Sequence, residues 1–184
     1  MIGLALVHYP VRDGKGATIS SAITNIDVHD IARTGRTYGS ARLFVVSPID
    51  AQRELVQRIR GHWVEGAGKD RIPARKKALE RVAPVASLED AIAAFGELAG
   101  RRPRVWATAA NPRGRETIAF ADARSTFADE PTLLVFGTAH GLADPALDGA
   151  DGLLAPIDGL DDEFNHLSVR SAVAIILDRL LGAR

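Results

Sequence analysis

The chain contains no cysteine among its 184 residues. This absence excludes a disulfide framework, a thiolate zinc site, an iron–sulfur cluster and a cysteine nucleophile. Long apolar runs are also missing, since none approaches the roughly 18 residues that a membrane-spanning helix needs. The first residues lack the basic lead and the small-residue cleavage site of a signal peptide, and they read as a strand. We therefore expect a cytoplasmic protein.

The signatures of several enzyme classes are absent as well. The five histidines are scattered, and no two have the i,i+4 spacing of a helical metal site, so we expect no metal. No Gly-x-Ser-x-Gly elbow is present for a serine hydrolase. Residues 66–70 resemble a phosphate loop, but Trp63 and Asp70 stand where that motif needs glycine and a hydroxyl residue. These residues are better explained as a basic surface loop.

The chain has no excess of charge of either sign, since its net charge is zero. Its charged residues are nevertheless segregated along the sequence. Residues 58–81 contain eight Lys or Arg against three acids, whereas residues 126–165 contain nine acids and no Lys or Arg. The basic stretch can face phosphates, and the acidic stretch suits a neutral or cationic ligand. Trp63 lies within the basic stretch, where it either stacks on a base or belongs to the core.

Apolar residues are plentiful at 46% of the chain, beside 25% charged residues, which is the balance of a folded globular domain. Short apolar runs alternate with amphipathic segments, the pattern of a mostly parallel sheet with helices on both faces. We therefore predict one α/β domain over residues 1–184. The expected strands are 3–8, 41–47, 82–86, 104–108, 132–136 and 152–155, and the expected helices are 25–38, 50–60, 73–81, 87–99 and 167–181.

The helix predicted over residues 25–38 has two distinct faces. Asn25 or Asp27 can cap it, and its apolar positions fall on one side at helical spacing. A polar stripe lies beside that apolar face. It consists of Asn25, His29, Arg33 and Arg36. Such a stripe usually faces solvent, with Arg33 paired to Asp30 or His29.

Three segments, in their order along the chain, resemble the motifs of the SPOUT RNA methyltransferases. Residues 24–34 place polar side chains about two helical turns before an Arg-Thr pair. Residues 133–142 form a strand followed by the loop Gly-Thr-Ala-His-Gly-Leu. Residues 154–173 run from a strand through a proline to Asn-x-x-Ser-Val at the start of a helix. The chain resembles in particular a bacterial branch found alone or joined to a tRNA guanine-N1 methyltransferase.

This resemblance implies an α/β fold with a C-terminal trefoil knot, S-adenosylmethionine bound in that knot, and a homodimer. It implies RNA as the substrate, with tRNA favoured over rRNA. Two alternatives differ in function class. One is a module of the same fold that binds RNA or protein without catalysis. The other is an unrelated doubly wound domain, such as a flavodoxin-like regulator.

The resemblance also indicates which residues hold the cofactor. Gly137, Gly141 and Gly159 lie in loops that follow strands, where open α/β sheets bind ligands and where glycine lets the backbone approach adenosine. Ser168 either caps the last helix or contributes to the cofactor site. The full expected set is Thr108, Phe136, Gly137, Thr138, His140, Gly141, Leu142, Ile157, Gly159, Asn165, His166, Leu167 and Ser168.

Catalytic and RNA-binding residues are expected on the first helix and in the basic stretch. Arg33 is expected to orient a phosphate or the target base, with Asp27 assisting proton removal and Asn25 beside them. The residues expected to contact RNA are His29, Arg36, Arg75, Lys76 and Lys77.

Overall fold

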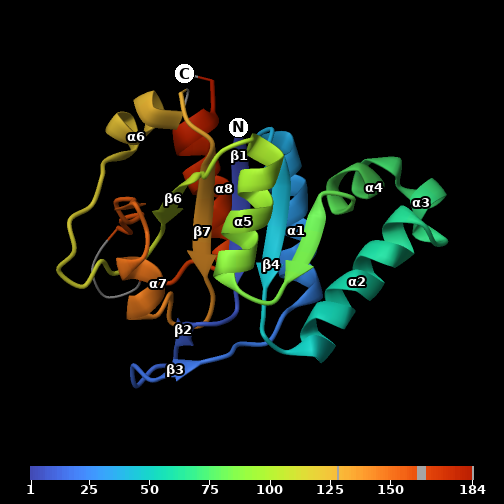
Figure 1. Cartoon of the computed structure of the whole chain (residues 1–184), viewed down its shortest axis with the longest axis horizontal. Helices are drawn as coiled ribbons and strands as arrows, with labels where there is room; N and C mark the ends of the chain where they lie inside the picture. Colours follow the sequence, from blue (N-terminus) through green and yellow to red (C-terminus); the bar gives the residue numbers. More distant parts are fainter. Residues whose placement is uncertain (128, 161–164, 184) are drawn as a thin grey trace.

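The computed structural model describes residues 1–127, 129–160 and 165–183. Its centre is a six-stranded sheet in the order β5–β4–β1–β7–β6–β8, with every neighbouring pair parallel (Figure 1). The predicted α/β class is confirmed. The strands are β1 (Ile2–Val7), β4 (Arg42–Val46), β5 (Val82–Val85), β6 (Arg104–Ala107), β7 (Thr132–Gly137) and β8 (Gly152–Leu153).

Every predicted helix is present with small shifts at its ends, and α2 continues past the predicted end to Val64. Five short elements were not predicted: the two strands of a hairpin, β2 (Val11–Arg12) and β3 (Thr18–Ile19), and three short helices. The helices are α1 (Asn25–Thr37), α2 (Asp50–Val64), α3 (Gly68–Arg71), α4 (Pro73–Leu79), α5 (Leu88–Ala99), α6 (Phe120–Phe127), α7 (Asp144–Asp148) and α8 (Val169–Leu181). Of these, α3, α6 and α7 are the unpredicted ones.

Helix α1 begins where a side chain satisfies its free backbone amides. Thr24 is the N-cap, and its hydroxyl accepts a hydrogen bond from the amide of Asp27. The prediction that Asn25 or Asp27 caps this helix was therefore wrong, because both residues lie inside the first turn. The expected apolar face is confirmed, with Val28 and Ile31 buried.

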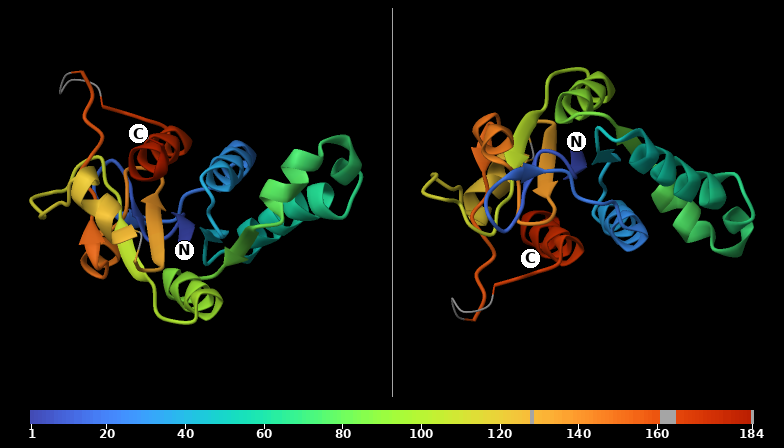
Figure 2. Two further views of the ribbon diagram at one scale, coloured as in Figure 1. Left: turned by 90° about the horizontal axis from the view of Figure 1, so that it is seen from above. Right: turned by 90° about the horizontal axis from the view of Figure 1, so that it is seen from below.

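The strands bury both faces of the sheet, because successive side chains point to opposite sides. Leu4 and Leu6 pack in the cluster that contains residues of α1, α2, α4, α6 and α8. Ala5 and Val7 pack in the second cluster, with residues of α5 and α7. Figure 2 shows α1 and α8 on one side of the sheet and α5 on the other.

The chain returns from the sheet edge to the centre before its last helix. β8 lies beside β6 at the edge, whereas α8 packs against α1, α6 and β7. Ile118 and Leu154 form a parallel bridge, so the returning segment starts beside the connection between β6 and α6. The predicted trefoil knot would form in this region, and it remains a prediction.

The described part of the chain includes no helix long and apolar enough to cross a membrane. Three of the nine acidic residues within the stretch 126–165 lie outside the described residues. These are Asp161, Asp162 and Glu163.

Candidate active site

The C-terminal ends of β1, β7, β6 and β8 meet at one edge of the sheet. Val7 pairs with Gly137, and Ala107 pairs with Leu153, at the last residues of these strands. Thr138 continues from β7, and its hydroxyl donates a hydrogen bond to the carbonyl of Val7 at 3.0 Å. Open parallel sheets bind their ligands at this edge. Most of the predicted cofactor residues follow these strand ends.

Residues 137–143, here called the glycine loop, turn tightly back on β7. A Cβ added at Gly137 would lie 2.5 Å from the amide nitrogen of Leu142, so Gly137 is needed for the turn itself. Gly141 has a φ of +93° and no described atom within 4 Å of an added Cβ, which leaves open space beside its Cα. Its amide and carbonyl are bonded to Thr138 and Arg12. The side chains of Phe136 and Leu142 are buried in the core, so a ligand can reach only their backbones.

The third predicted motif is closed by its own hydrogen bonds. The Asn165 side-chain amide donates to the carbonyl of Ile157 at 2.8 Å, which ties the two ends of this loop together. Ser168 caps α8 by accepting a hydrogen bond from the amide of Ser171. Capping of α8, one of the two roles predicted for Ser168, is therefore confirmed. Leu167 is 46% exposed, and Gly159, His140 and His166 are exposed as well.

Thr108 is the predicted cofactor residue at the end of β6. Its hydroxyl donates to the carbonyl of Val135 at 3.0 Å. The side chain is thus anchored to the neighbouring strand at the same edge of the sheet as Thr138.

The start of α8 lies beside the start of α1. Arg170 donates to Asp27 Oδ1 at 3.1 Å, and the Thr24 hydroxyl donates to Asp27 Oδ2 at 2.5 Å. Asp27 is only 9% exposed, so this buried carboxylate joins the first and third predicted motifs. A second ion pair, between Arg170 Nε and Asp30 Oδ2, is longer at 3.9 Å.

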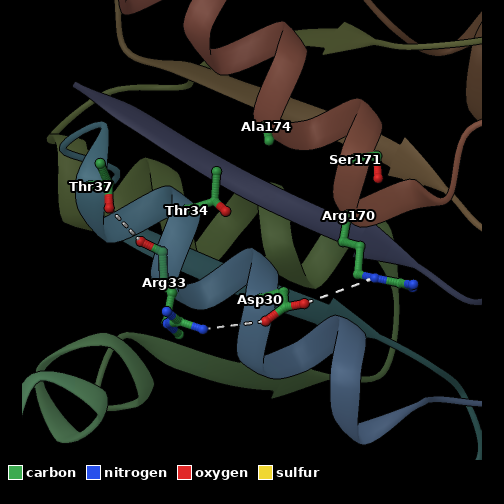
Figure 3. A pocket seen from close by; sticks show the side chains of 7 residues that line it. All are labelled: Asp30, Arg33, Thr34, Thr37, Arg170, Ser171 and Ala174. Atoms are coloured by element: carbon green, nitrogen blue, oxygen red, sulfur yellow. Dashed lines mark hydrogen bonds and ion pairs between the residues drawn. The ribbon is translucent and has the colours of Figure 1, made fainter.

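Arg33 stands in the wall between two surface grooves. The first is about 400 Å³, lies between α1 and α8, and is also lined by Asp30, Arg170 and Ser171 (Figure 3). The second is about 270 Å³, lies between α1 and α4, and is lined by Arg33 together with Arg36 and Arg75. Three predicted functional arginines, from two separate parts of the sequence, therefore border one groove.

The side chain of Arg33 itself is exposed and pairs with Asp30 at 3.6 Å. This pair is one of the two predicted for it. Asn25, which begins α1, is also exposed. Because an exposed ion pair of this kind is weak, the Arg33 guanidinium can exchange Asp30 for another anion.

Trp63 is enclosed by side chains. The Arg75 guanidinium carbon lies 4.6 Å from the Trp63 ring centroid, and the edges of His29 and His62 approach at 5.6 and 5.1 Å between centroids. Trp63 packs against the core cluster on the α1 side of the sheet. Trp63 was expected either to stack on a base or to belong to the core. This packing places it at the edge of the core.

The helix α4 carries the remaining predicted RNA contacts. Lys77 is exposed and Lys76 is half-buried on it. His29 faces this helix, and its pKa is lowered by burial and by the charge of Arg75.

Sequence reasoning missed two groups around the glycine loop. His8, at the end of β1, is 1% exposed and bonds to Ser21. Arg113 has a φ of 54° and donates to the carbonyl of Leu142 at 2.9 Å. Such backbone conformations are costly for residues other than glycine and cluster at functional sites. A possible signal was the Arg-x-Arg pair that follows β6.

Arg115, the second member of that pair, binds the two carboxylates of α7. Its distances to Asp144 and Asp148 are 2.8 and 2.7 Å. The hydrogen bond from Arg115 lowers the pKa of Asp144. Within residues 1–127, 129–160 and 165–183, no group of His, Asp and Glu side chains is arranged to hold a metal ion.

Comparisons with known proteins give matches over nearly the whole chain. A family model described as SAM-dependent RNA methyltransferase matches residues 1–182. A protein of Oleidesulfovibrio alaskensis named tRNA (guanine-N(1)-)-methyltransferase is 44% identical over 178 residues, which are 97% of this chain and 41% of that protein. An uncharacterised protein of Aquifex aeolicus is 39% identical over 181 residues, covering 97% of this chain and 87% of its own length.

The fold has solved counterparts as well. The crystal structure of an A. aeolicus TrmH/SpoU tRNA modifying enzyme has a TM-score of 0.58 at 16% identity, and covers 98% of this chain and 73% of the solved one. At this identity the likeness concerns the fold, which is that of the SPOUT class. The chain spans about two fifths of the length of the tRNA methyltransferase from O. alaskensis. By its match over nearly the whole sequence, the chain belongs to the family of SAM-dependent RNA methyltransferases.

Proposed function

We propose that the protein transfers a methyl group from S-adenosylmethionine to RNA, and that the substrate is a tRNA guanine. The observation that carries this proposal is the position of Arg33, in the wall shared by the α1–α8 groove and the arginine-lined α1–α4 groove. The name of the O. alaskensis relative supports tRNA and the N1 atom of guanine as the target. We further propose a homodimer that acts in the cytoplasm.

The edge of the sheet that carries the glycine loop fits an adenosine-containing cofactor. Gly141 leaves open space beside its Cα there, and Thr108 and Thr138 follow neighbouring strands at the same edge. These three residues, with the loop that Asn165 closes onto Ile157, would hold the cofactor. S-adenosylmethionine supplies an activated methyl group, so the protein mainly has to align the acceptor atom with it.

The α1–α4 groove fits the RNA backbone. Arg33, Arg36 and Arg75 line it, and none of the described residues that line it carries a carboxylate. Guanidinium groups bind phosphate through paired N–H donors. Arg33 also borders the α1–α8 groove, so RNA bound through this arginine would extend towards Arg170, which lines that groove and donates to Asp27.

Methylation at N1 of guanine releases a proton, which a base must accept. Asp27 is our candidate for this role. Each of its oxygens takes one hydrogen bond, from Thr24 and from Arg170, and each retains a second lone pair.

The test is methyl transfer to an unmodified tRNA transcript, followed by mass spectrometry of the nucleosides. We expect 1-methylguanosine to appear with turnover. The binding of S-adenosylhomocysteine is measured in parallel by calorimetry and by melting temperature, because a ligand of the native state raises that temperature. A protein that binds this ligand but methylates no tRNA or rRNA would be a binding module of the same fold, and a protein that does not bind it would contradict the cofactor assignment.

A further inference from the structure

The segment that follows β1 braces the glycine loop. The amide of Arg12 donates to the carbonyl of Gly141 at 2.9 Å, and the amide of His140 donates to the carbonyl of Arg12 at 3.1 Å. Val11 and Leu142 form an antiparallel bridge between the same two segments. The hairpin β2–β3 thus holds the outer half of the loop through backbone hydrogen bonds.

A chain of side-chain hydrogen bonds holds the inner half. His8 Nδ1 lies 2.9 Å from the Ser21 hydroxyl, which lies 2.5 Å from the Thr138 hydroxyl. The Thr138 hydroxyl in turn donates to the carbonyl of Val7 at 3.0 Å. Residues more than a hundred positions apart in the sequence are joined in this way at the end of β1.

The direction of this chain is determined by its last acceptor. A carbonyl can only accept, so the single hydroxyl proton of Thr138 goes to Val7. Ser21 must then donate to Thr138, and its oxygen accepts from His8. His8 therefore carries its proton on Nδ1, and its Nε2 is a bare acceptor.

Burial indicates that His8 serves more than packing. The ring is 1% exposed, and its Nε2 is buried without a hydrogen-bond partner among the described residues. An unpaired buried polar atom costs about 1 to 3 kcal/mol, which an apolar side chain of similar size would avoid. Despite this cost, residue 8 is a histidine, and its ring belongs to a chain of hydrogen bonds that ends on the glycine loop.

We propose that His8 is a positioning residue for the methyltransferase site, which through Ser21 holds Thr138 and the glycine loop in the form that receives the cofactor. This inference rests on the proposed function. Neither His8 nor Ser21 contacts the cofactor. They determine the fraction of molecules in which the glycine loop has the conformation that binds it.

The test compares variants of His8 and Ser21 in the full chain. Ser21→Ala and His8→Leu break the chain, whereas His8→Asn keeps an N–H donor near the position of Nδ1. Loss of one hydrogen bond's net contribution corresponds to about fivefold in affinity. We expect Ser21→Ala and His8→Leu to weaken S-adenosylhomocysteine binding by about five- to tenfold in calorimetry, and His8→Asn to remain within about twofold of the parent. The double variant should bind no worse than the worse single variant.

Kinetics separate positioning from damage to the fold. The KM for S-adenosylmethionine should rise in Ser21→Ala while kcat at saturating cofactor stays within about twofold. Ser125→Ala, an exposed serine on α6, is the matched control and should change neither. Equal affinity in Ser21→Ala and the parent would overturn the inference, even if His8→Leu fails to fold. A parent that binds no S-adenosylhomocysteine would instead contradict the proposed function, and the parent titration detects this first.

Nitrogen NMR of the imidazole gives a second readout that needs no cofactor. At pH 7 the His8 ring should show a protonated Nδ1 and an unprotonated Nε2, with the signal assigned by its loss in His8→Asn. The opposite tautomer would break the directed chain and overturn the inference.

Discussion

Replacing Arg33 distinguishes most clearly between a surface ion pair and a role in catalysis, because the two roles predict different effects on methyl transfer. Its pair with Asp30 is exposed, so Arg33→Ala should cost well under about 1 kcal/mol of stability. Methyl transfer should fall at least about tenfold, which is a loss of about 1.4 kcal/mol of transition-state stabilisation, while S-adenosylhomocysteine affinity stays the same. Arg33→Lys keeps the charge but loses the planar fork. An alanine variant as active as the parent would remove Arg33 from the mechanism.

His8 makes stability depend on pH in a defined window. Burial lowers its pKa from 6.5 to about 4, although the charge of Asp27 opposes the shift. The unfolded chain therefore takes up a proton before the folded one does, so the stabilisation is complete above pH 6.5 and is lost as the pH falls towards 4. We expect unfolding in urea to show about 2 kcal/mol less stability at pH 5 than at pH 7.5 from this group. In His8→Asn that part of the loss should be missing, and a parent with a flat profile would contradict the shift.

Single residues were predictable where a local pattern identifies them. The stripe on α1 selected Arg33 and Arg36, and the turn chemistry before α8 selected Ser168. His8 could not be found in this way, because its importance comes from Ser21 and Thr138, which only the folded sheet brings to it. A lone histidine after a strand has no spacing signal.

At the scale of elements, the basic stretch of residues 58–81, which runs from α2 to α4, is expected to bind RNA and is here called the RNA-binding arm. We expect replacement of Lys76 and Lys77 by alanine to reduce the salt dependence of RNA binding, because each lost phosphate contact removes roughly 0.7 to 0.9 from the logarithmic slope. Adding Arg75→Ala should lower the slope further and also destabilise the fold, since Arg75 packs on Trp63.

The control for the arm lies at the other end of the sheet. Arg101 and Arg102 precede β6 and are exposed, so their replacement by alanine should leave the slope unchanged. Binding of tRNA measured at several salt concentrations gives the slopes. Parallel slopes for the arm variant and the parent would place the RNA on another surface.

Elements were predictable in proportion to the apolar surface that they bury. The long helices α1, α5 and α8 and the central strands repeat their apolar positions with clear periods. The hairpin and helices α6 and α7 are too short for a period to emerge, and tertiary contacts hold them. The hairpin is bonded to the glycine loop, and Arg115 ties α7 to the loop after β6. A part of the candidate site that sequence alone could not supply, the support of the glycine loop by the hairpin, lies in these short elements.

At the scale of the whole molecule, the sheet brings the predicted motifs together. The first motif begins α1, the second follows β7, and the third begins α8, and all three lie around the C-terminal ends of the strands. The order of motifs along the chain predicted the family but not this proximity. The buried contact of Asp27 with Arg170 joins segments that no local pattern relates.

The place of β1 between β4 and β7 has a consequence for synthesis on the ribosome. One neighbour of β1 emerges soon after it, but the other, Thr132–Gly137, is translated more than a hundred residues later. Until then one edge of the first strand is unpaired. Pairing it with β7 requires closing a loop of more than a hundred residues, and the entropy lost in that closure slows folding. An unpaired, apolar strand edge is also a surface for aggregation. Nascent chains that stall before β7 is translated should therefore depend on chaperones, whereas chains in which β7 and α8 have emerged can complete the sheet.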